Sequence, residues 1–412
     1  MDSILLKKQD GFFKETINLA ASKSESNRAL ILNALTGFEG DLENLSAARD
    51  TQTMIRLLKS TDERADVLDA GTTMRFLTAF FAITNQVKTM TGTPRMCQRP
   101  IGILVDALRT LGAHIEYLGK EGYPPLKLQG FINQKSESLS IRGDVSSQFI
   151  SAILMIAPLL PNGLKINLTG EIGSIPYIQM TLKQMEAFGV FVESNWEEKT
   201  LIVKPQKYVA TSYKVESDWS GASYWYAIVA LAKNPLIEIE LVGLKENSLQ
   251  GDSVIVAIMN QLGVKSTFTD RGVLLTKINS ELSFNWDFIN CPDLAQTVAV
   301  VVACKNIPAI FTGLESLKVK ETDRVKALQN ELIKIGAELK EIIPNEKYEI
   351  VSQGIWDDLP RFETYDDHRM AMAFAPISMI QDIIIEEPNV VAKSYPSFWD
   401  DLRKIVEVQE IN

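Results

Sequence analysis

One arrangement of polar and apolar positions recurs along the 412-residue chain: a short polar turn leads directly into an apolar run of helix length. Polar residues at such a turn are typical of a helix N-terminus, where they satisfy free backbone N–H groups. Because the runs are apolar almost all round, we expect each to form a buried helix. The six copies are SKSESNRALILNAL from Ser22, AGTTMRFLTAFFA from Ala70, VSSQFISAILMIAPLL from Val145, WSGASYWYAIVAL from Trp219, CPDLAQTVAVVVAC from Cys291 and DDHRMAMAFAPISMI from Asp366.

The copies are evenly spaced apart from the first. Successive intervals are 48, 75, 73, 74 and 73 residues when the equivalent points are Ser24, Thr72, Ser147, Ser220, Leu294 and Asp367. A fixed interval, here about 74 residues, indicates a repeated supersecondary unit. The short first interval corresponds to a stretch missing between Lys59 and Val67, so we expect the first unit to lack only a peripheral pair of strands.

Each apolar run is followed by a strand-like segment and then by a second helix with one wet face. Several of these second helices end at a glycine before a new strand, as in LGAHIEYL and IGAELKE, which is the usual left-handed helix stop. The unit is therefore predicted to be βαβαββ-like, with a mixed sheet that the second helix covers from outside. The apolar stripe of one such helix consists of Ile101, Leu104, Val105, Leu108 and Leu111.

Six units predict an α/β protein with two lobes of three units each. The polar ends of three buried helices in each lobe would point their free N–H groups and positive dipole ends at the gap between the lobes. Such a gap attracts anions. The basic residues of the polar turns support this, although for any one of them solvation at the surface is an equal alternative: Lys23, Arg28, Arg75, Arg95, Arg99, Lys320, Arg324, Arg369 and Lys393.

Composition narrows the class of partner. With 42 Lys and Arg against 52 Asp and Glu, the formal net charge of −10 argues against duplex DNA or an anionic membrane as the main partner. A small substrate with several phosphate or carboxylate groups fits better. The chain has no GxGxxG after a strand, no GxxxxGK[ST] and no GxSxG, which removes the support for nucleotide-binding and hydrolase-elbow classes.

Cysteine and histidine usage bears on compartment and metal content. Three cysteines without CxxC spacing favour a reducing cytoplasm, and the N-terminus lacks the pattern of a secretory signal. No run reaches the roughly 18 apolar residues of a membrane span. Two histidines, His114 and His368, argue against a metal site, and we expect no cofactor.

Several residues have both a chemical and a structural interpretation. In LKVKETDRV, Lys320, Glu321 and Arg324 form either an anion site or an ordinary solvent-facing helix start. Asp293 is either a helix cap or a general base. Ser146 and Ser147 could equally cap a helix, and His368 could be an orienting group, a proton carrier or a structural residue. Cys97 has no neighbouring histidine to activate it, which favours an ordinary thiol over a nucleophile.

Taken together and in this order, the motifs resemble the 5-enolpyruvylshikimate-3-phosphate (EPSP) synthase family. The resemblance implies a two-lobed, inside-out α/β barrel of six βαβαββ units, three per lobe, that closes over phosphoenolpyruvate and shikimate 3-phosphate. It also implies a cytoplasmic monomer without metal or cofactor. One lobe is expected at about residues 20–217 and the other at residues 1–19 plus 218–412. The motifs are SKSESNRALIL, AGTTMR, PRMCQRPI, YPPLKLQG, DVSSQF, SIPYI, NSLQGD, PDLAQ, VKETDRV, DDHRMAM and AKSYP.

The resemblance also implies roles for individual residues. The first lobe would bind much of the shikimate 3-phosphate, and the second would complete the phosphoenolpyruvate site and carry the catalytic Asp293. Asp293 would accept the hydroxyl proton, while Glu321 and Lys23 would move the methyl proton and assist phosphate departure. Shikimate 3-phosphate falls to Lys23, Ser24, Arg28, Ser146, Ser147, Gln148, Ser174, Tyr177, Asp293 and Lys320. Phosphoenolpyruvate falls to Lys23, Gly71, Arg99, Gln148, Arg324, Arg369 and Lys393.

The chain departs from the family pattern at a few positions. Asp69 stands where asparagine is frequent, and its carboxylate would weaken anion binding unless it is paired. Phe76 replaces a common proline, and Ser316 replaces a frequent asparagine. Two alternatives stay open: an enolpyruvyl transferase acting on a UDP-linked amino sugar, whose loop cysteine Cys97 does not match in position, and a catalytically silent anion-binding relative.

Overall fold

The computed structural model describes residues 3–144 and 146–411, and within it the chain divides into two compact units. One unit is Lys23–Val215, and the other combines Met1–Ser22 with Glu216–Asn412. Each unit has its own hydrophobic core. The N-terminal segment belongs to the second unit because it supplies strands to two of its sheets.

The six predicted buried helices are all present. In α7 all 13 residues are buried. In α3 the buried residues lie on nearly all sides of the helix. Val145, the first residue of the third apolar segment, lies outside the described residues. The buried helices are α1 (Lys23–Leu35), α3 (Gly71–Ile83), α5 (Ser147–Ile156), α7 (Trp219–Leu231), α9 (Ala295–Cys304) and α11 (His368–Phe374).

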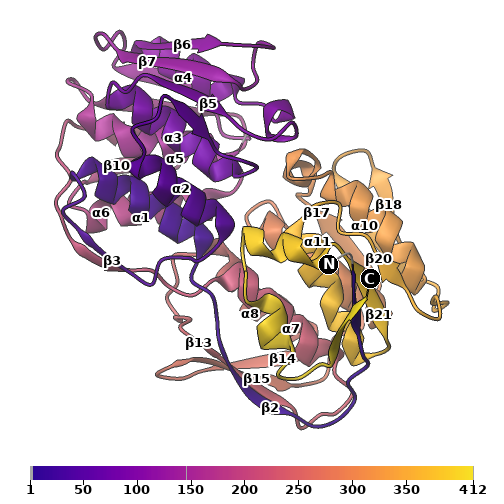
Figure 1. Ribbon diagram of the computed structural model, residues 1–412. Helices are drawn as coiled ribbons and strands as arrows, with labels where there is room; N and C mark the ends of the chain where they lie inside the picture. Colours follow the sequence, from indigo (N-terminus) through magenta and orange to yellow (C-terminus); the bar gives the residue numbers. More distant parts are fainter. Residues whose placement is uncertain (1–2, 145, 412) are drawn as a thin grey trace. The chain divides into compact units, whose positions relative to one another are not determined.

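A second, outer helix follows each buried one, as predicted (Figure 1). In α4 the residues Leu104, Val105, Leu108 and Leu111 of the predicted stripe are buried. The helix stops are also confirmed, because Gly112 and Gly336 have φ values of 116° and 64°, where a Cβ would be strained. The outer helices are α2 (Arg49–Lys59), α4 (Gly102–Leu111), α6 (Ile175–Ala187), α8 (Ile255–Gln261), α10 (Arg324–Leu332) and α12 (Phe398–Leu402).

Five four-stranded sheets surround these helices, and each has one parallel pair among antiparallel ones. In the Lys23–Val215 unit the orders are β4-β5-β7-β6 and β10-β11-β9-β8. Their strands are β4 (Arg64–Asp66), β5 (Lys88–Thr91), β6 (Ala113–Tyr117), β7 (Leu126–Phe131), β8 (Ser138–Arg142), β9 (Leu164–Thr169), β10 (Val192–Asn195) and β11 (Thr200–Val203).

In the other unit the sheet orders are β14-β15-β13-β2, β16-β17-β19-β18 and β20-β21-β1-β22. The chain's first two strands thus pair with strands that follow hundreds of residues later, as in the register Ser3↔Glu386. The strands are β1 (Ser3–Leu6), β2 (Lys14–Asn18), β13 (Glu238–Val242), β14 (Val264–Phe268), β15 (Gly272–Lys277), β16 (Phe284–Asp287), β17 (Ala309–Thr312), β18 (Ala337–Ile343), β19 (Lys347–Ser352), β20 (Arg361–Phe362), β21 (Ile383–Glu386) and β22 (Val408–Ile411).

The sixth sheet is shorter. Within the described residues it has two strands, β3 (Asp41–Glu43) and β12 (Ser212–Lys214), which pair in parallel. It belongs to the first repeat, where the sequence predicts a missing pair of strands, and the prediction is confirmed. The two buried helices α1 and α3 still pack against each other, so the loss affects the edge of the unit and not its core.

Candidate active site

In the unit that contains both chain ends, the beginnings of three buried helices come together. α9 packs against α7 and α11, and the single turn η4 (Pro292–Leu294) leads into α9. Asp293 lies on this turn. Asp367 caps α11 by accepting a hydrogen bond from the backbone N–H of Arg369 at 2.9 Å. The repeated polar turns therefore place charged side chains at neighbouring helix ends.

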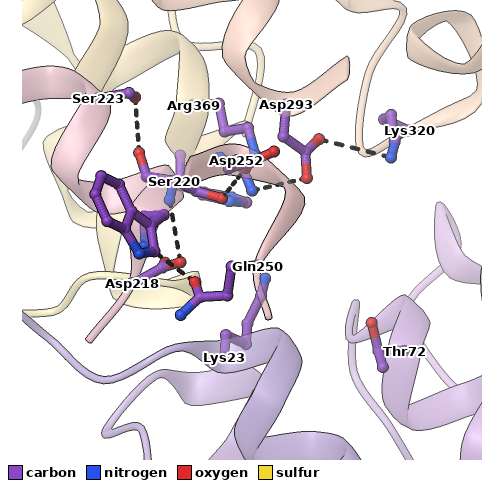
Figure 2. Close-up of polar contacts among 12 residues, drawn as sticks. Lys23, Thr72, Asp218, Ser220, Ser223, Gln250, Asp252, Asp293, Lys320 and Arg369 are labelled. Carbon is purple, nitrogen blue, oxygen red and sulfur yellow. Dashed lines mark hydrogen bonds and ion pairs between the residues drawn. The ribbon is translucent and has the colours of Figure 1, made fainter. Parts of the chain in front are cut away.

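Asp293 is the centre of this cluster. Its Oδ1 accepts a hydrogen bond from Arg324 Nη1 at 3.0 Å and lies 3.6 Å from Lys320 Nζ. Its Oδ2 accepts from Arg369 Nη2 at 2.9 Å (Figure 2). Burial by itself would raise the pKa of Asp293, but the three cations outweigh it and hold the pKa well below 3.8. The carboxylate is therefore ionised at neutral pH.

Arg324 connects Asp293 to two further carboxylates. Its guanidinium, which is 1% exposed, donates to Asp367 from Nε at 2.7 Å and to Glu321 from Nη2 at 2.9 Å. Burial tends to lower the pKa of Arg324, but the carboxylates of Asp367, Glu321 and Asp293 raise it overall. Arg324 begins α10, and the Asp323 side chain caps that helix by accepting from the Lys326 N–H at 3.0 Å. The helix cap and the ion network thus fix the start of α10.

One further cation, Lys393, belongs to this unit, and Arg369 and Lys320 have contacts or neighbours besides those given above. Lys393, at the end of η8 (Pro388–Lys393), donates to the backbone oxygen of Asp366 at 2.6 Å and lies 2.9 Å from its carboxylate. Arg369 also approaches the hydroxyl of Tyr224 at 3.4 Å. Lys320 follows η5 (Glu315–Val319), and burial lowers its pKa while Asp293 partly opposes this. The structure brings Asp293, Lys320, Glu321, Arg324 and Arg369 into one network.

In the Lys23–Val215 unit, the most buried cation is Arg28. Its guanidinium donates to neutral oxygens, including Thr181 Oγ1 at 2.7 Å and the Ser24 backbone oxygen at 2.9 Å. The rings of Phe76 and Tyr177 lie 5.3 Å and 5.9 Å from its central carbon. Burial lowers the pKa of Arg28 to about 10, so the group stays charged at neutral pH. A buried cation with such partners favours an anionic ligand.

Phe76, a departure from the family pattern, therefore has a structural role. Its ring faces the Arg28 guanidinium within the range of a cation–π contact. A proline at this position would offer no aromatic face. The Phe76 ring thus supports Arg28, the cation to which the family resemblance gives a role in binding shikimate 3-phosphate.

A second cationic group surrounds the start of α3. Gln148 links it to α5, since Oε1 accepts from Arg75 Nη1 at 2.8 Å and Nε2 donates to Thr72 Oγ1 at 2.9 Å. Gly71 lies so close to the guanidinium groups of Arg75 and Arg99 that an added Cβ would stand 2.8 Å from their nitrogens. The backbone N-terminus of a 13-residue helix and two arginines thus meet at one glycine.

The remaining predicted residues of this unit lie near these two groups. Ser146 caps α5 by accepting from the Gln148 N–H at 3.4 Å. The Tyr177 backbone oxygen accepts from Arg28 Nη2 at 3.4 Å. Ser174 precedes α6 with a φ of 54°, a conformation that non-glycine residues adopt at a cost. Lys23 pairs with Asp50 at 3.0 Å.

The Asp69 carboxylate is paired. Both of its oxygens accept from Arg49 Nη2 at 2.9 Å. We expected the Asp69 carboxylate to weaken anion binding at the nearby turn unless it is paired. Arg49 provides that pairing and offsets the negative charge. Arg49 lies at the start of α2, and no local motif links it to Asp69.

Surface solvation is excluded for most of the basic residues of the polar turns. Arg95 is exposed and Lys23 and Lys320 are half-buried. The residues with at most 8% exposure are Arg28, Arg75, Arg99, Arg324, Arg369 and Lys393. Lys and Arg are rarely fully buried unless they are paired, so each unit by itself holds buried cations that suit anionic partners.

Cys97 and His368 were the two other residues with more than one interpretation. Cys97, on η1 (Met96–Gln98), approaches the Gly92 backbone oxygen at 3.7 Å through its sulfur. His368 is buried, with Nδ1 3.8 Å from Asp367 Oδ1.

Asp252 is a residue of this unit to which the sequence assigns no role. It lies on η3 (Gly251–Val254), is 2% exposed and accepts a hydrogen bond from Ser220 at the start of α7. Its motif, NSLQGD, carries part of the family resemblance, but no spacing in the sequence predicts that the carboxylate is buried beside Asp293.

Within residues 3–144 and 146–411, no group of three or more His, Cys, Asp and Glu side chains could hold a metal ion. No helix in this part of the chain is both long and apolar enough to span a bilayer.

Comparison with known proteins gives one consistent result. Residues 59–402 match the family described as EPSP synthase (3-phosphoshikimate 1-carboxyvinyltransferase). A 3-phosphoshikimate 1-carboxyvinyltransferase of Bacteroides fragilis strain YCH46 is 50% identical over 401 residues, which cover 95% of each chain. One of Erwinia tasmaniensis is 35% identical over 424 residues, with 95% of this chain and 96% of the relative covered. The solved EPSP synthase of Acinetobacter baumannii has the same fold, with a TM-score of 0.76, 20% identity and coverage of 99% and 100%.

Proposed function

The chain belongs to the EPSP synthase family and transfers the enolpyruvyl group of phosphoenolpyruvate to the 5-hydroxyl of shikimate 3-phosphate, and we propose that the clusters described above perform this reaction. The products are 5-enolpyruvylshikimate 3-phosphate and phosphate, on the route to aromatic amino acids. The observation that carries the proposal is Asp293, a largely buried, ionised carboxylate in contact with three cations.

Phosphoenolpyruvate binds through its phosphate and carboxylate groups. We assign it Arg324, Arg369 and Lys393 of one unit, together with Lys23, Gly71, Arg99 and Gln148 of the other. Charge-assisted hydrogen bonds from guanidinium groups to these anions are strong and directional. When the substrate's anionic groups replace Asp293 as partners of Arg324 and Arg369, the Asp293 carboxylate is released to act as a base.

Shikimate 3-phosphate binds mainly to the Lys23–Val215 unit. The buried Arg28 cation supplies the main charge, and the Thr181 hydroxyl and the backbone oxygens of Ser24 and Tyr177 hold its guanidinium in place. We assign Asp293 and Lys320 of the other unit to the 5-hydroxyl end of this substrate. The full set is Lys23, Ser24, Arg28, Ser146, Ser147, Gln148, Ser174, Tyr177, Asp293 and Lys320.

The chemistry is addition followed by elimination. The methylene carbon of phosphoenolpyruvate takes a proton, the 5-hydroxyl oxygen bonds to the adjacent carbon, and Asp293 accepts the hydroxyl proton. Loss of a methyl proton and of phosphate then restores the double bond. Glu321 and Lys23 move the methyl proton and assist the leaving phosphate, while the arginines stabilise the developing charge.

We propose that the enzyme acts as a cytoplasmic monomer without metal or cofactor, nucleic acid or membrane. All assigned residues come from one chain. The three cysteines are free, which agrees with a reducing compartment, and the net charge is −10. The oligomeric state is measured by light scattering of the purified protein.

Phosphate release tests the function directly. The purified protein is incubated with phosphoenolpyruvate and either shikimate 3-phosphate or UDP-N-acetylglucosamine, and we expect release only with shikimate 3-phosphate. Phosphate release with UDP-N-acetylglucosamine instead would show that the acceptor is the UDP-sugar and not shikimate 3-phosphate. Binding of shikimate 3-phosphate without release would favour a catalytically silent protein.

Gly71→Ala should weaken phosphoenolpyruvate binding selectively. The new Cβ would stand 2.8 Å from nitrogens of Arg75 and Arg99, so the guanidinium groups must move. Losing one well-placed charged hydrogen bond raises KM for phosphoenolpyruvate about tenfold to a hundredfold. Affinity for shikimate 3-phosphate, measured by calorimetry, should stay unchanged.

Gly119→Ala is the matched control, because its Cβ would meet only Pro125 at 3.8 Å. Steady-state kinetics with varied phosphoenolpyruvate should leave this variant at the wild-type KM. An unchanged KM in Gly71→Ala would remove Gly71 from the proposed site.

A further inference from the structure

Asp252 is a buried carboxylate that the reaction scheme above does not use. Its Oδ2 accepts a hydrogen bond from Ser220 Oγ at the start of α7. Its Oδ1 is buried and makes no hydrogen bond with any described residue. Gln250, just before η3, accepts from the Trp219 N–H at 3.0 Å and donates to the Ser217 backbone oxygen at 2.8 Å, which ties this segment to α7.

The charged groups around Asp252 belong to the proposed active site. Figure 2 shows its side chain next to Arg369 and near Asp293, with Ser220 beside it. Asp293 from η4 and Asp218 from the start of α7 repel its charge, and Arg369 from α11 attracts it. The thiol of Cys291, also next to η4, is neutral because burial raises its pKa to about 12. Asp252 thus shares one low-dielectric environment with the proposed base and a substrate-binding arginine.

We propose that Asp252 is a positioning residue that sets the proton affinity of Asp293. Repulsion between two carboxylates acts on both, so an ionised Asp252 makes Asp293 a stronger base. This opposes Arg324, Arg369 and Lys320, which make Asp293 a weak one. The same negative charge offsets part of the positive charge of Arg369. The inference rests on the proposed role of Asp293.

The charge of Asp252 changes near neutral pH. Burial is the largest influence on this group, Asp293 adds to it, and together they raise the pKa of Asp252 to about 7. Ser220 and Arg369 act in the opposite direction. Above this pH the carboxylate is ionised and Asp293 is activated. Below it the carboxylate is neutral and the activation is lost.

Asp252→Asn tests the inference. The amide keeps an acceptor for Ser220 and removes the charge. At about pH 8 we expect kcat to fall about tenfold, because the base is weaker by about one pKa unit. KM for phosphoenolpyruvate should not rise, since the positive charge of Arg369 is then less offset by a neighbouring carboxylate. At about pH 5.5, where Asp252 of the wild type is protonated, the two enzymes should have similar kcat. An equal loss at both pH values, or none at either, would overturn the proposal.

Ser220→Ala provides an independent test if Asp252→Asn fails to fold. It removes the hydrogen bond that lowers the pKa of Asp252, so the rise of kcat with pH should move to higher pH. Ser223→Ala is the matched control: this serine lies one turn further along α7 and bonds to the Ser220 backbone oxygen at 2.7 Å. Its pH midpoint should equal that of the wild type, and a midpoint in Ser220→Ala equal to the control's would contradict the proposal.

Asp293→Asn, assayed alongside, distinguishes a failure of the proposed role of Asp293 from a failure of the proposed role of Asp252. If that variant keeps its turnover, the proposed base is wrong. If it loses turnover while Asp252→Asn shows no pH-dependent loss, only the role of Asp252 is wrong.

Discussion

Replacing Asp293 by asparagine should lower kcat about a hundredfold to ten-thousandfold, the usual contribution of a general base. The amide is nearly isosteric but cannot take up the hydroxyl proton. Shikimate 3-phosphate should still bind, because Arg28 and its contacts with Thr181 and Ser24 are untouched. Phosphate release measures kcat, and titration calorimetry measures binding.

Asp323→Asn is the control for this substitution. It makes the same chemical change at the cap of α10, where asparagine caps as well as aspartate. Its turnover should be close to that of the wild type. Turnover of Asp293→Asn within a few-fold of this control would refute the role of Asp293 as base.

Arg324→Met should destabilise the unit that contains Asp293 by about 3–5 kcal/mol at neutral pH, the usual cost of leaving buried charges unpaired. The methionine fills similar space but leaves Asp293, Glu321 and Asp367 without the buried guanidinium that now joins them. Urea unfolding measures the free energy of unfolding, and the variant should also lack activity.

The pH dependence distinguishes lost charge from lost packing. In the wild type the pKa of Asp293 is lowered, so its ion pairs stabilise the fold above about pH 4 and less as the pH falls below it. In Arg324→Met the pKa of Asp293 should be lowered less, because one of its three cations is gone, and the difference in stability should therefore shrink as the pH falls below about 4. A constant difference would indicate packing alone. Arg142→Met, which removes an exposed ion pair with Asp144, should leave the unfolding midpoint nearly unchanged.

Local sequence was sufficient for the repeated elements. Each of the six apolar runs forms a buried helix and each is followed by an outer one, because periodicity of hydrophobic side chains acts over neighbouring turns. The missing pair of strands in the first repeat was visible as a short interval. Glycines such as Gly112 and Gly336 end helices through their own backbone freedom, independent of distant contacts.

Only part of the candidate site could be predicted from the local sequence. Sequence motifs identified the basic residues of the turns, and the structure adds that most of them are buried. Which carboxylate each one meets depends on pairs far apart in the chain, such as Arg324 with Asp367 and Arg369 with Asp293. No local pattern encodes those distances.

By itself, then, the sequence determined the repeat, the helix positions and the residue types available for binding anions, since all of these follow from nearest-neighbour patterns along the chain. The tertiary structure decided how the charges are paired: it joined Arg49 to Asp69, set Phe76 against Arg28 and buried Asp252 beside Asp293. The physical reason is that Coulomb energy and desolvation depend on separation and burial in space, and both are established only when distant segments pack together.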